Sequence, residues 1–288
     1  MPDLSGKQLV SADWLAHHID APDLVVVDGS WHLPAEKRDP RAEYRATHIP
    51  GARFFDIDAI SDQASTLPHM LPSAAAFSAH MRELGIGAGD CVVAYDASAY
   101  GLFSAARVWW TLRAFGHANV AVLDGGLKKW TSEGRAVTAE PVPARSGGRF
   151  TAALDHALVR NLEQMQALIA AGSCQIADAR TPGRFEGREP EPRPGLRSGH
   201  MPGARNVPFS TLLAPDGTMQ QPTELQAAFK RAGIDLARPI VTSCGSGVTA
   251  AVLSLALAVL GQPTHGLYDG SWSEWGQSSL DTTVATGA

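Results

Sequence analysis

The chain has 288 residues, of which 44% are hydrophobic, with a formal net charge of −5 and an isoelectric point near 6.0. This length accommodates two ordinary domains with hydrophobic cores. Lys and Arg are scattered along the sequence, which argues against a nucleic-acid partner because phosphate binding needs a concentrated basic surface. No apolar run reaches the roughly 20 residues of a membrane span, and the first residues lack a signal-peptide layout. We therefore expect a cytoplasmic protein without a membrane or nucleic-acid partner.

Short apolar runs alternate with helical stretches along the chain. In chain order, residues 24–28, 91–95, 175–178 and 240–243 are predicted strands, and Ala- and Leu-rich helices follow the second and fourth of them. An HxPGA turn stands at 48–52 and again at 200–204, where Pro and Gly suit adjacent turn positions and the Gly takes a positive φ. This order predicts an α/β fold of mostly parallel sheets with helices on both faces.

The second half of the chain repeats the first. HIPGAR at 48–53 returns as HMPGAR at 200–205, and LDGGLKKW at 123–130 matches LYDGSWSEW at 267–275. Asp28 ends the first strong predicted strand, and Asp178 ends its counterpart 150 positions later. Three anchors in the same order indicate a duplicated domain. We predict one domain at 1–138, an extended linker at 139–154 and a second domain at 155–288.

The three cysteines differ in their settings. An odd number without C-x-x-C spacing argues against a disulfide framework and against zinc, and no metal or cofactor is expected. Cys91 and Cys174 stand at the start of apolar runs, which is typical of packing thiols. Cys244 instead lies between a predicted strand and a predicted helix, and Asp96 occupies the matching position of the first copy. The first copy is therefore predicted to be catalytically inactive, and its Asp predicts a wet, polar loop.

The residues after Cys244 suit a bound anion. In an open α/β sheet, ligands bind at the carboxyl ends of the strands, where loops lead to helix N-termini. Backbone N–H groups that converge there stabilise a thiolate or a persulfide anion. A plain turn with a bystander cysteine is the alternative. The predicted anion-binding loop consists of Gly245, Ser246, Gly247, Val248 and Thr249.

The tandem HxPGA turns and CGSGVTA at 244–250 resemble the two-domain sulfurtransferases of the rhodanese superfamily, over about residues 9–276. The resemblance implies two tandem rhodanese-like domains, of which the second is active and the first is a degenerate copy. It also implies a ping-pong reaction. Cys244 would take sulfur from a small-molecule donor as a persulfide and pass it to a thiol such as thioredoxin, or to cyanide.

The loop sequence bears on the sulfur donor. Family members specific for thiosulfate carry basic residues just after the cysteine, whereas Gly245, Ser246 and Gly247 are uncharged. The expected main donor is therefore 3-mercaptopyruvate, with thiosulfate as a secondary donor; thiosulfate as the main donor is the alternative. The RF…EPEPR pattern implies that Arg184 and Arg193 bind the substrate, since a guanidinium binds planar oxygens bidentately.

Three further arginines lie in the same stretch of sequence. Arg180 is expected to pair with Asp178 in a structural salt bridge, and the roles of Arg188 and Arg197 are left open between solvated and substrate-binding side chains.

Residues of the first half are also implicated by the resemblance. The FFDID and HMLP motifs imply that Asp58 and His69 act with Ser246 in proton transfer. The family usually has Asp before this His, where the present chain has Pro68. An interdomain hydrogen bond without a chemical role is the alternative for Asp58 and His69.

Two other classes of protein share features with this sequence. Cys-loop phosphatases need an Arg that closes the loop at C-x5-R, but Ala250 stands six residues after Cys244. A non-catalytic rhodanese-like sensor module is the second alternative, because a fold does not fix a function.

Overall fold

A computed structural model describes residues 2, 4, 6–145, 148–262 and 266–287. The chain forms two compact units. The first comprises Met1–Gln63, Leu71–Asp155 and Leu213–Met219, and the second comprises Ala64–Met70, His156–Leu212 and Gln220–Ala288. Two short segments thus belong to the unit other than the one that surrounds them in the sequence. Ser146 and Gly147 of the predicted linker, and the predicted domain ends Met1 and Ala288, lie outside the described residues.

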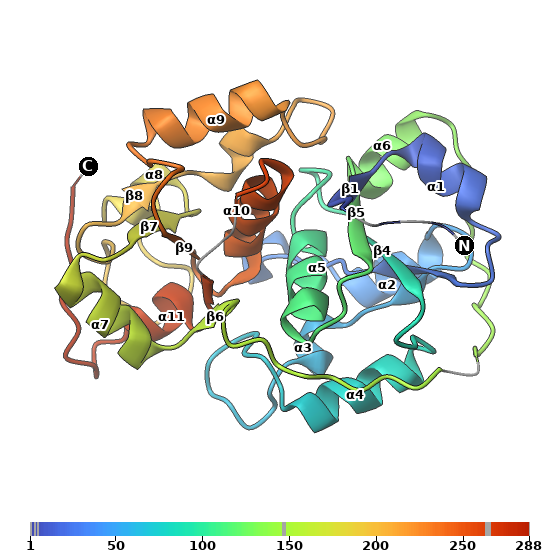
Figure 1. Cartoon of the computed structure of the whole chain (residues 1–288), viewed down its shortest axis with the longest axis horizontal. Helices are drawn as coiled ribbons and strands as arrows, with labels where there is room; N and C mark the ends of the chain where they lie inside the picture. The colour runs from blue at the N-terminus through green and yellow to red at the C-terminus, as the bar shows by residue number, and fades with distance from the viewer. Residues whose placement is uncertain (1, 3, 5, 146–147, 263–265, 288) are drawn as a thin grey trace. The chain divides into compact units, whose positions relative to one another are not determined.

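The first unit holds one five-stranded sheet among the described residues, with strand order β1-β5-β4-β2-β3 and parallel pairing throughout. Its longest ladder pairs Leu24 to Asp28 with Cys91 to Tyr95. The elements (Figure 1) are β1 (Leu9–Val10), α1 (Ala12–His18), β2 (Leu24–Asp28), η1 (Pro34–Glu36), α2 (Pro40–Ala46), β3 (Arg53–Phe54), α3 (Ile57–Ile60), α4 (Ala74–Glu83), β4 (Cys91–Tyr95), α5 (Ala105–Ala114), β5 (Val120–Leu123) and α6 (Gly126–Ser132).

The second unit repeats this topology. Its five described strands follow the order β6-β10-β9-β7-β8, again all parallel, so each strand has a counterpart in the first sheet. The elements are β6 (Val159–Arg160), α7 (Leu162–Ala171), β7 (Gln175–Asp178), α8 (Pro182–Phe185), β8 (Arg205–Asn206), η2 (Phe209–Leu212), α9 (Pro222–Arg231), β9 (Ile240–Ser243), α10 (Val248–Val259), β10 (Leu267–Tyr268) and α11 (Ser271–Trp275). The predicted duplication and α/β class are confirmed.

Helices cover both faces of the sheets. In the second unit, Val241 packs with Met165 of α7 and Trp272 of α11, whereas the Oγ1 atom of Thr242 lies 2.8 Å from Oγ of Ser254 in α10. Because neighbouring strand residues point to opposite faces, α10 lies across the sheet from α7 and α11. In the first unit α5 takes the place of α10 against β4 and β5, as Figure 1 shows.

The two HxPGA turns have the same structure. Gly51 and Gly203 have φ angles of 77° and 76°, as predicted from the turn chemistry. His48 Nδ1 lies 2.8 Å from the carbonyl oxygen of Tyr44, and His200 Nδ1 lies 2.8 Å from that of Phe185. Each imidazole therefore ties its turn to the preceding helix.

The two cysteines predicted to pack lie where the sequence indicated. Cys91 is the first residue of β4 and is buried; its thiol donates to the carbonyl oxygen of Pro2. Cys174 directly precedes β7, and partial burial raises the pKa of its thiol. Trp130, Trp272 and Trp275 are buried.

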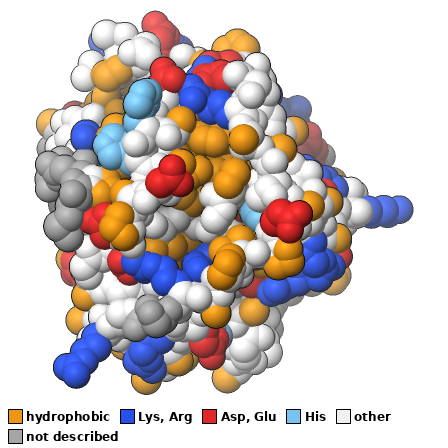
Figure 2. Space-filling view, turned by 90° about the vertical axis from the view of Figure 1, so that its right-hand side faces the viewer, with side chains coloured by type: hydrophobic (Ala, Val, Ile, Leu, Met, Phe, Trp, Pro, Cys, Tyr) orange, Lys and Arg blue, Asp and Glu red, His pale blue; other side chains and the backbone are white. Residues whose placement is uncertain are grey.

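No helix among the described residues is long and apolar enough to cross a membrane. On the face drawn in Figure 2, Lys and Arg side chains are interspersed with acidic and hydrophobic ones and form no continuous basic field.

Candidate active site

Cys244 is the first residue after β9, at the carboxyl end of a central strand of the second sheet. The loop turns into α10 at Gly247, whose φ of 78° lies in the left-handed region that favours glycine. The helix that follows is apolar and buried along most of its length, which anchors the loop. Cys244 itself is only 2% exposed.

The start of α11 holds the carbonyl side of the cysteine loop. The backbone N–H of Trp272 donates to the carbonyl oxygen of Cys244 (3.0 Å), and Ser273 donates to that of Gly245 through its N–H (2.8 Å) and its hydroxyl (2.6 Å). In a trans peptide each N–H points opposite to the preceding C=O. The N–H groups of Gly245 and Ser246 therefore point away from α11.

Further backbone N–H groups lie on either side of Gly245 and Ser246. The first turn of α10 contributes N–H groups that have no intrahelical acceptor. The N–H of Cys244 donates to Oγ of Ser271 (3.3 Å), a residue with a φ of 49°. The geometry thus suits the predicted anion-binding loop at residues 245–249.

Ser271 and Ser273 were not predicted as site residues. Their signal lay in the comparison of the copies, because Ser271 and Ser273 replace Gly126 and Lys128 of the first copy.

His69 and Ser246 come together within the second unit. His69 Nδ1 lies 3.1 Å from Oγ of Ser246 and 3.2 Å from its carbonyl oxygen, and both side chains are buried. The backbone of His69 adopts a φ of 61°, which is uncommon for a residue with a side chain. The two contacts with Ser246 place the imidazole beside the hydroxyl.

Asp58 belongs to the first unit, on the short helix α3. Its Oδ2 atom accepts a hydrogen bond from Nε1 of Trp31 (3.2 Å). The predicted part of Asp58 in proton transfer stays a prediction.

Arg184 lies against the cysteine loop. A Cβ atom built on Gly245 would lie 2.9 Å from Nη2 of Arg184, so the guanidinium packs on the bare backbone there. Glu191 holds this guanidinium, with Oε2 2.5 Å from Nη2 and Oε1 3.3 Å from Nε. Glu191 is part of the EPEPR motif but was not predicted as a site residue.

The other arginines of this stretch serve different contacts. Arg180 is buried and pairs with Asp178 at 2.7 Å, so its predicted structural salt bridge is confirmed. Arg197 donates to the carbonyl oxygens of Thr282 and Trp275 and so binds the C-terminal segment. Arg188 is 69% exposed and pairs with Glu186.

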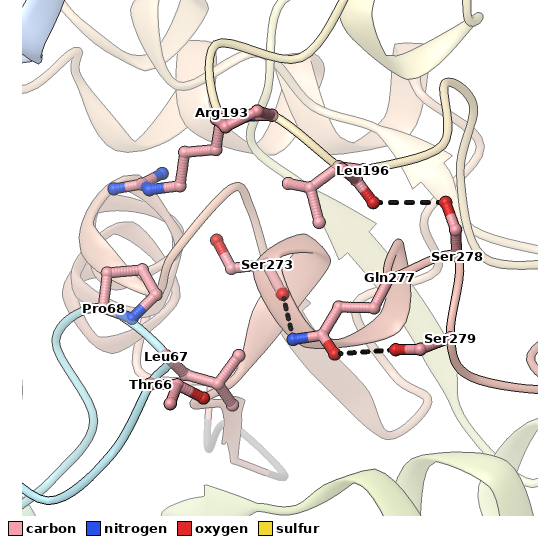
Figure 3. A pocket seen from close by; sticks show the side chains of 11 residues that line it. Thr66, Leu67, Pro68, Arg193, Leu196, Ser273, Gln277, Ser278 and Ser279 are labelled. Carbon is pink, nitrogen blue, oxygen red and sulfur yellow. Dashed lines mark hydrogen bonds between the residues drawn. The ribbon is translucent and has the colours of Figure 1, made fainter.

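Arg193 lines a cavity of about 420 Å³ in the second unit (Figure 3). Pro68, next to His69, and Ser273, which binds the loop carbonyl, line the same cavity. Figure 3 shows Gln277 bridging the carbonyl oxygen of Ser273 and the hydroxyl of Ser279. The wall is mostly uncharged, with Arg193 as its cation.

The first copy corrects one expectation. Asp96 follows β4 as Cys244 follows β9, but its carboxylate is fully buried, so the expected wet loop is wrong. Asp96 accepts hydrogen bonds from the N–H groups of Ser98 (3.0 Å), Phe103 (2.8 Å) and Ala105 (2.9 Å). The carboxylate of Asp96 therefore binds the backbone N–H groups that lie before and at the start of α5.

Comparison with known proteins supports the same reading of the chain. The model of the family described as "Rhodanese-like domain" matches residues 11–133 and 161–278. The chain belongs to the rhodanese-like family.

Several members of this family are similar over nearly their whole length. Human 3-mercaptopyruvate sulfurtransferase is 44% identical over 93% of this chain and 92% of its own. Chicken thiosulfate sulfurtransferase is 44% identical over 94% and 93%. The crystal structure of SseA from Escherichia coli, described as a 3-mercaptopyruvate sulfotransferase, has a TM-score of 0.84 at 43% identity and covers 93% of this chain and 99% of its own. Both rhodanese-like copies are thus present in this chain.

Proposed function

We propose that the chain is a sulfurtransferase whose main donor is 3-mercaptopyruvate. The observation that carries this proposal is the contact between Arg184 and the side-chain-free Gly245, directly after Cys244. It sets a carboxylate-binding guanidinium beside the nucleophile while the loop itself bears no positive side chain. The relatives named 3-mercaptopyruvate sulfurtransferase support the same choice.

The first half-reaction forms a persulfide. The Cys244 thiolate attacks the thiol sulfur of 3-mercaptopyruvate; an S–S bond forms, the C–S bond breaks, and its electron pair leaves with the carbon as the enolate of pyruvate. The thiol proton of the substrate ends on that carbon, so no oxidant is needed. The loop amides at 245–249 would stabilise the persulfide anion.

Ser246 and His69 are the proposed proton carriers. The hydroxyl of Ser246 lies within hydrogen-bond distance of Nδ1 of His69, so a proton can pass between them as the thiol is deprotonated and the enolate protonated. Arg184 and Arg193 would bind the carboxylate and keto oxygens. Asp58 is proposed to assist the same proton transfer, on the strength of the sequence motif.

The second half-reaction restores the thiolate. An acceptor thiolate attacks the outer sulfur of the persulfide, the S–S bond to Cys244 breaks, and the acceptor leaves as a persulfide. Thioredoxin is the proposed protein acceptor, cyanide can take the sulfur in the same way, and the cytoplasm is the proposed compartment.

Thiosulfate is a second candidate donor, since its anionic sulfonate suits the same amides. The chicken relative named thiosulfate sulfurtransferase favours keeping this activity as a secondary one.

The proposal is tested by a single turnover without acceptor. Wild-type protein should release one pyruvate per chain from 3-mercaptopyruvate, and Cys244→Ser should release none above the protein-free background. Cys174→Ser should behave as the wild type, because Cys174 directly precedes β7 whereas Cys244 follows the opposite end of the paired strand β9. Pyruvate release by Cys244→Ser at the wild-type rate would overturn the proposal.

A further inference from the structure

A row of four alternating charges joins β7 to the cysteine loop. Asp178 accepts from Nη2 of Arg180 (2.7 Å), Arg180 Nη1 donates to Oε1 of Glu191 (2.7 Å), and Glu191 Oε2 accepts from Nη2 of Arg184 (2.5 Å). The formal charges of the row cancel. Arg184 ends the row at Gly245.

The inner members of this row are withdrawn from solvent. The side chains of Asp178, Arg180 and Glu191 are at most 2% exposed, while Arg184 is 18% exposed. Well-packed apolar residues often match or exceed a buried ion pair in stabilising a fold. Stability alone therefore does not explain the row. Its outermost cation, Arg184, is also its most exposed member.

Glu191 binds Arg184 from one side. It accepts from Nε and Nη2, and among the described residues no acceptor is bonded to Nη1. A guanidinium held along its Nε–Nη2 edge cannot swing away, yet it still presents Nη1 and the second Nη2 hydrogen to a ligand.

Gly245 supplies the space. A side chain at this position would begin 2.9 Å from Nη2 of Arg184 and would push the guanidinium off the loop. The φ of Gly245 is not in the left-handed region, so the backbone does not require a glycine there. The structure therefore explains the glycine at position 245 by the space that the Arg184 guanidinium needs.

The first unit lacks this row. The position of Arg180 is taken by Ser30, and the buried Asp28 accepts from the N–H of Ser30 (2.9 Å). The fold therefore does not need the row, which occurs in the copy that carries Cys244.

We propose that Glu191 is a positioning residue that holds Arg184 over Gly245 and thereby sets the preference for an α-keto carboxylate donor over thiosulfate. This inference rests on the proposed function of Cys244 and Arg184. Glu191 acts through Arg184 and does not touch the donor.

The test is a double-mutant cycle with both donors. Glu191→Gln keeps the shape but loses the charge, so KM for 3-mercaptopyruvate should rise about tenfold, whereas kcat and the kinetics with thiosulfate should change about twofold or less. The double variant Arg184→Ala/Glu191→Gln should be no worse than Arg184→Ala alone. Glu189→Gln, whose carboxylate contacts Thr181 instead, is the matched control and should leave both donors unaffected.

A second variant covers a failure of Glu191→Gln to fold. Gly245→Ala leaves Asp178, Arg180 and Glu191 unchanged but pushes the Arg184 guanidinium off the loop, and it should raise KM for 3-mercaptopyruvate selectively. Additive losses in the cycle, or equal losses with both donors in either variant, would overturn the inference. Absence of 3-mercaptopyruvate turnover in the wild type would instead overturn the proposed function.

Discussion

Nδ1 of His69 lies 3.1 Å from the hydroxyl oxygen of Ser246, although 177 positions separate the two residues in the sequence. The segment Ala64–Met70 brings the imidazole into the second unit, where the cysteine loop presents Ser246 directly before the Gly247 cap of α10. The proposed proton carrier Ser246 thus stands two residues from Cys244.

Replacing the proposed proton carriers Ser246 and His69 should slow the first half-reaction. We expect Ser246→Ala and His69→Gln each to lower kcat with 3-mercaptopyruvate about 100-fold, because the enolate then lacks a positioned acid. Transfer of sulfur from a preformed Cys244 persulfide to cyanide should change much less. Single-turnover pyruvate release and cyanolysis measure the two steps separately.

Ser243→Ala is the control for these variants. Ser243 is buried directly before Cys244, and its hydroxyl has no hydrogen-bond partner among the described residues. Its removal should leave kcat unchanged. If Ser243→Ala and Ser246→Ala lost activity equally, disturbance of the loop rather than proton transfer would explain both.

Arg193→Ala should weaken donor binding. The guanidinium lines the cavity beside Ser273, so its loss should raise KM for 3-mercaptopyruvate at least about tenfold. Arg188→Ala should have no measurable effect, because Arg188 is exposed and contacts Glu186. Steady-state kinetics of both variants decide the matter; an unchanged KM in Arg193→Ala would exclude Arg193 from the substrate site.

Arg180→Ala should strongly destabilise the second unit. It leaves the buried carboxylates of Asp178 and Glu191 without their shared cation, and breaking such a pair costs about 3–5 kcal/mol. Arg41→Ala, which removes a half-exposed pair with Asp56, should cost less than about 1 kcal/mol. Urea unfolding measures the free energy of unfolding of both variants. Similar losses in the two would show that the buried row stabilises the fold no more than an exposed ion pair does.

The buried Asp28 should make stability depend on pH. Burial raises the pKa of its carboxyl to about 6, while hydrogen bonds from Ser30 lower it less. A raised pKa means that the folded state binds the proton more tightly than the unfolded state. The contribution of Asp28 to the free energy of unfolding should therefore be greatest below pH 4 and fall by up to about 3 kcal/mol as the pH rises through 6.

Asp28→Asn isolates this contribution. An amide can still accept from the N–H of Ser30, but it does not titrate. The variant should gain stability relative to the wild type at pH 7 and not at pH 4, as measured by thermal unfolding at both values. A constant difference between the two proteins across this range would contradict the assignment.

Much of the fold could be predicted because the duplication left clear marks. Asp28 and Asp178 end equivalent strands, and both HxPGA glycines take the expected positive φ. The exchange of Ala64–Met70 and Leu213–Met219 between the units could not be predicted, since it depends on tertiary contacts and has no local pattern.

Only part of the candidate site could be predicted from the sequence. The setting of Cys244 between a strand and Gly-Ser-Gly was a local signal, and so was the mismatch with Asp96. Glu191 was missed because its contact with Arg184 depends on how the loop between them folds, and Ser271 was missed because its contact with Cys244 spans 27 positions. Asp96 was misjudged because burial of a carboxylate depends on whether backbone N–H groups surround it.

The most direct test of the account is the mass of the peptide that contains Cys244 after incubation with 3-mercaptopyruvate. We predict a gain of about 32 Da, one sulfur atom, on that peptide and none on the peptides of Cys91 and Cys174, with loss of the added mass when an acceptor thiol or cyanide follows. Pyruvate release without added mass on Cys244, or a gain on another cysteine instead, would contradict the account.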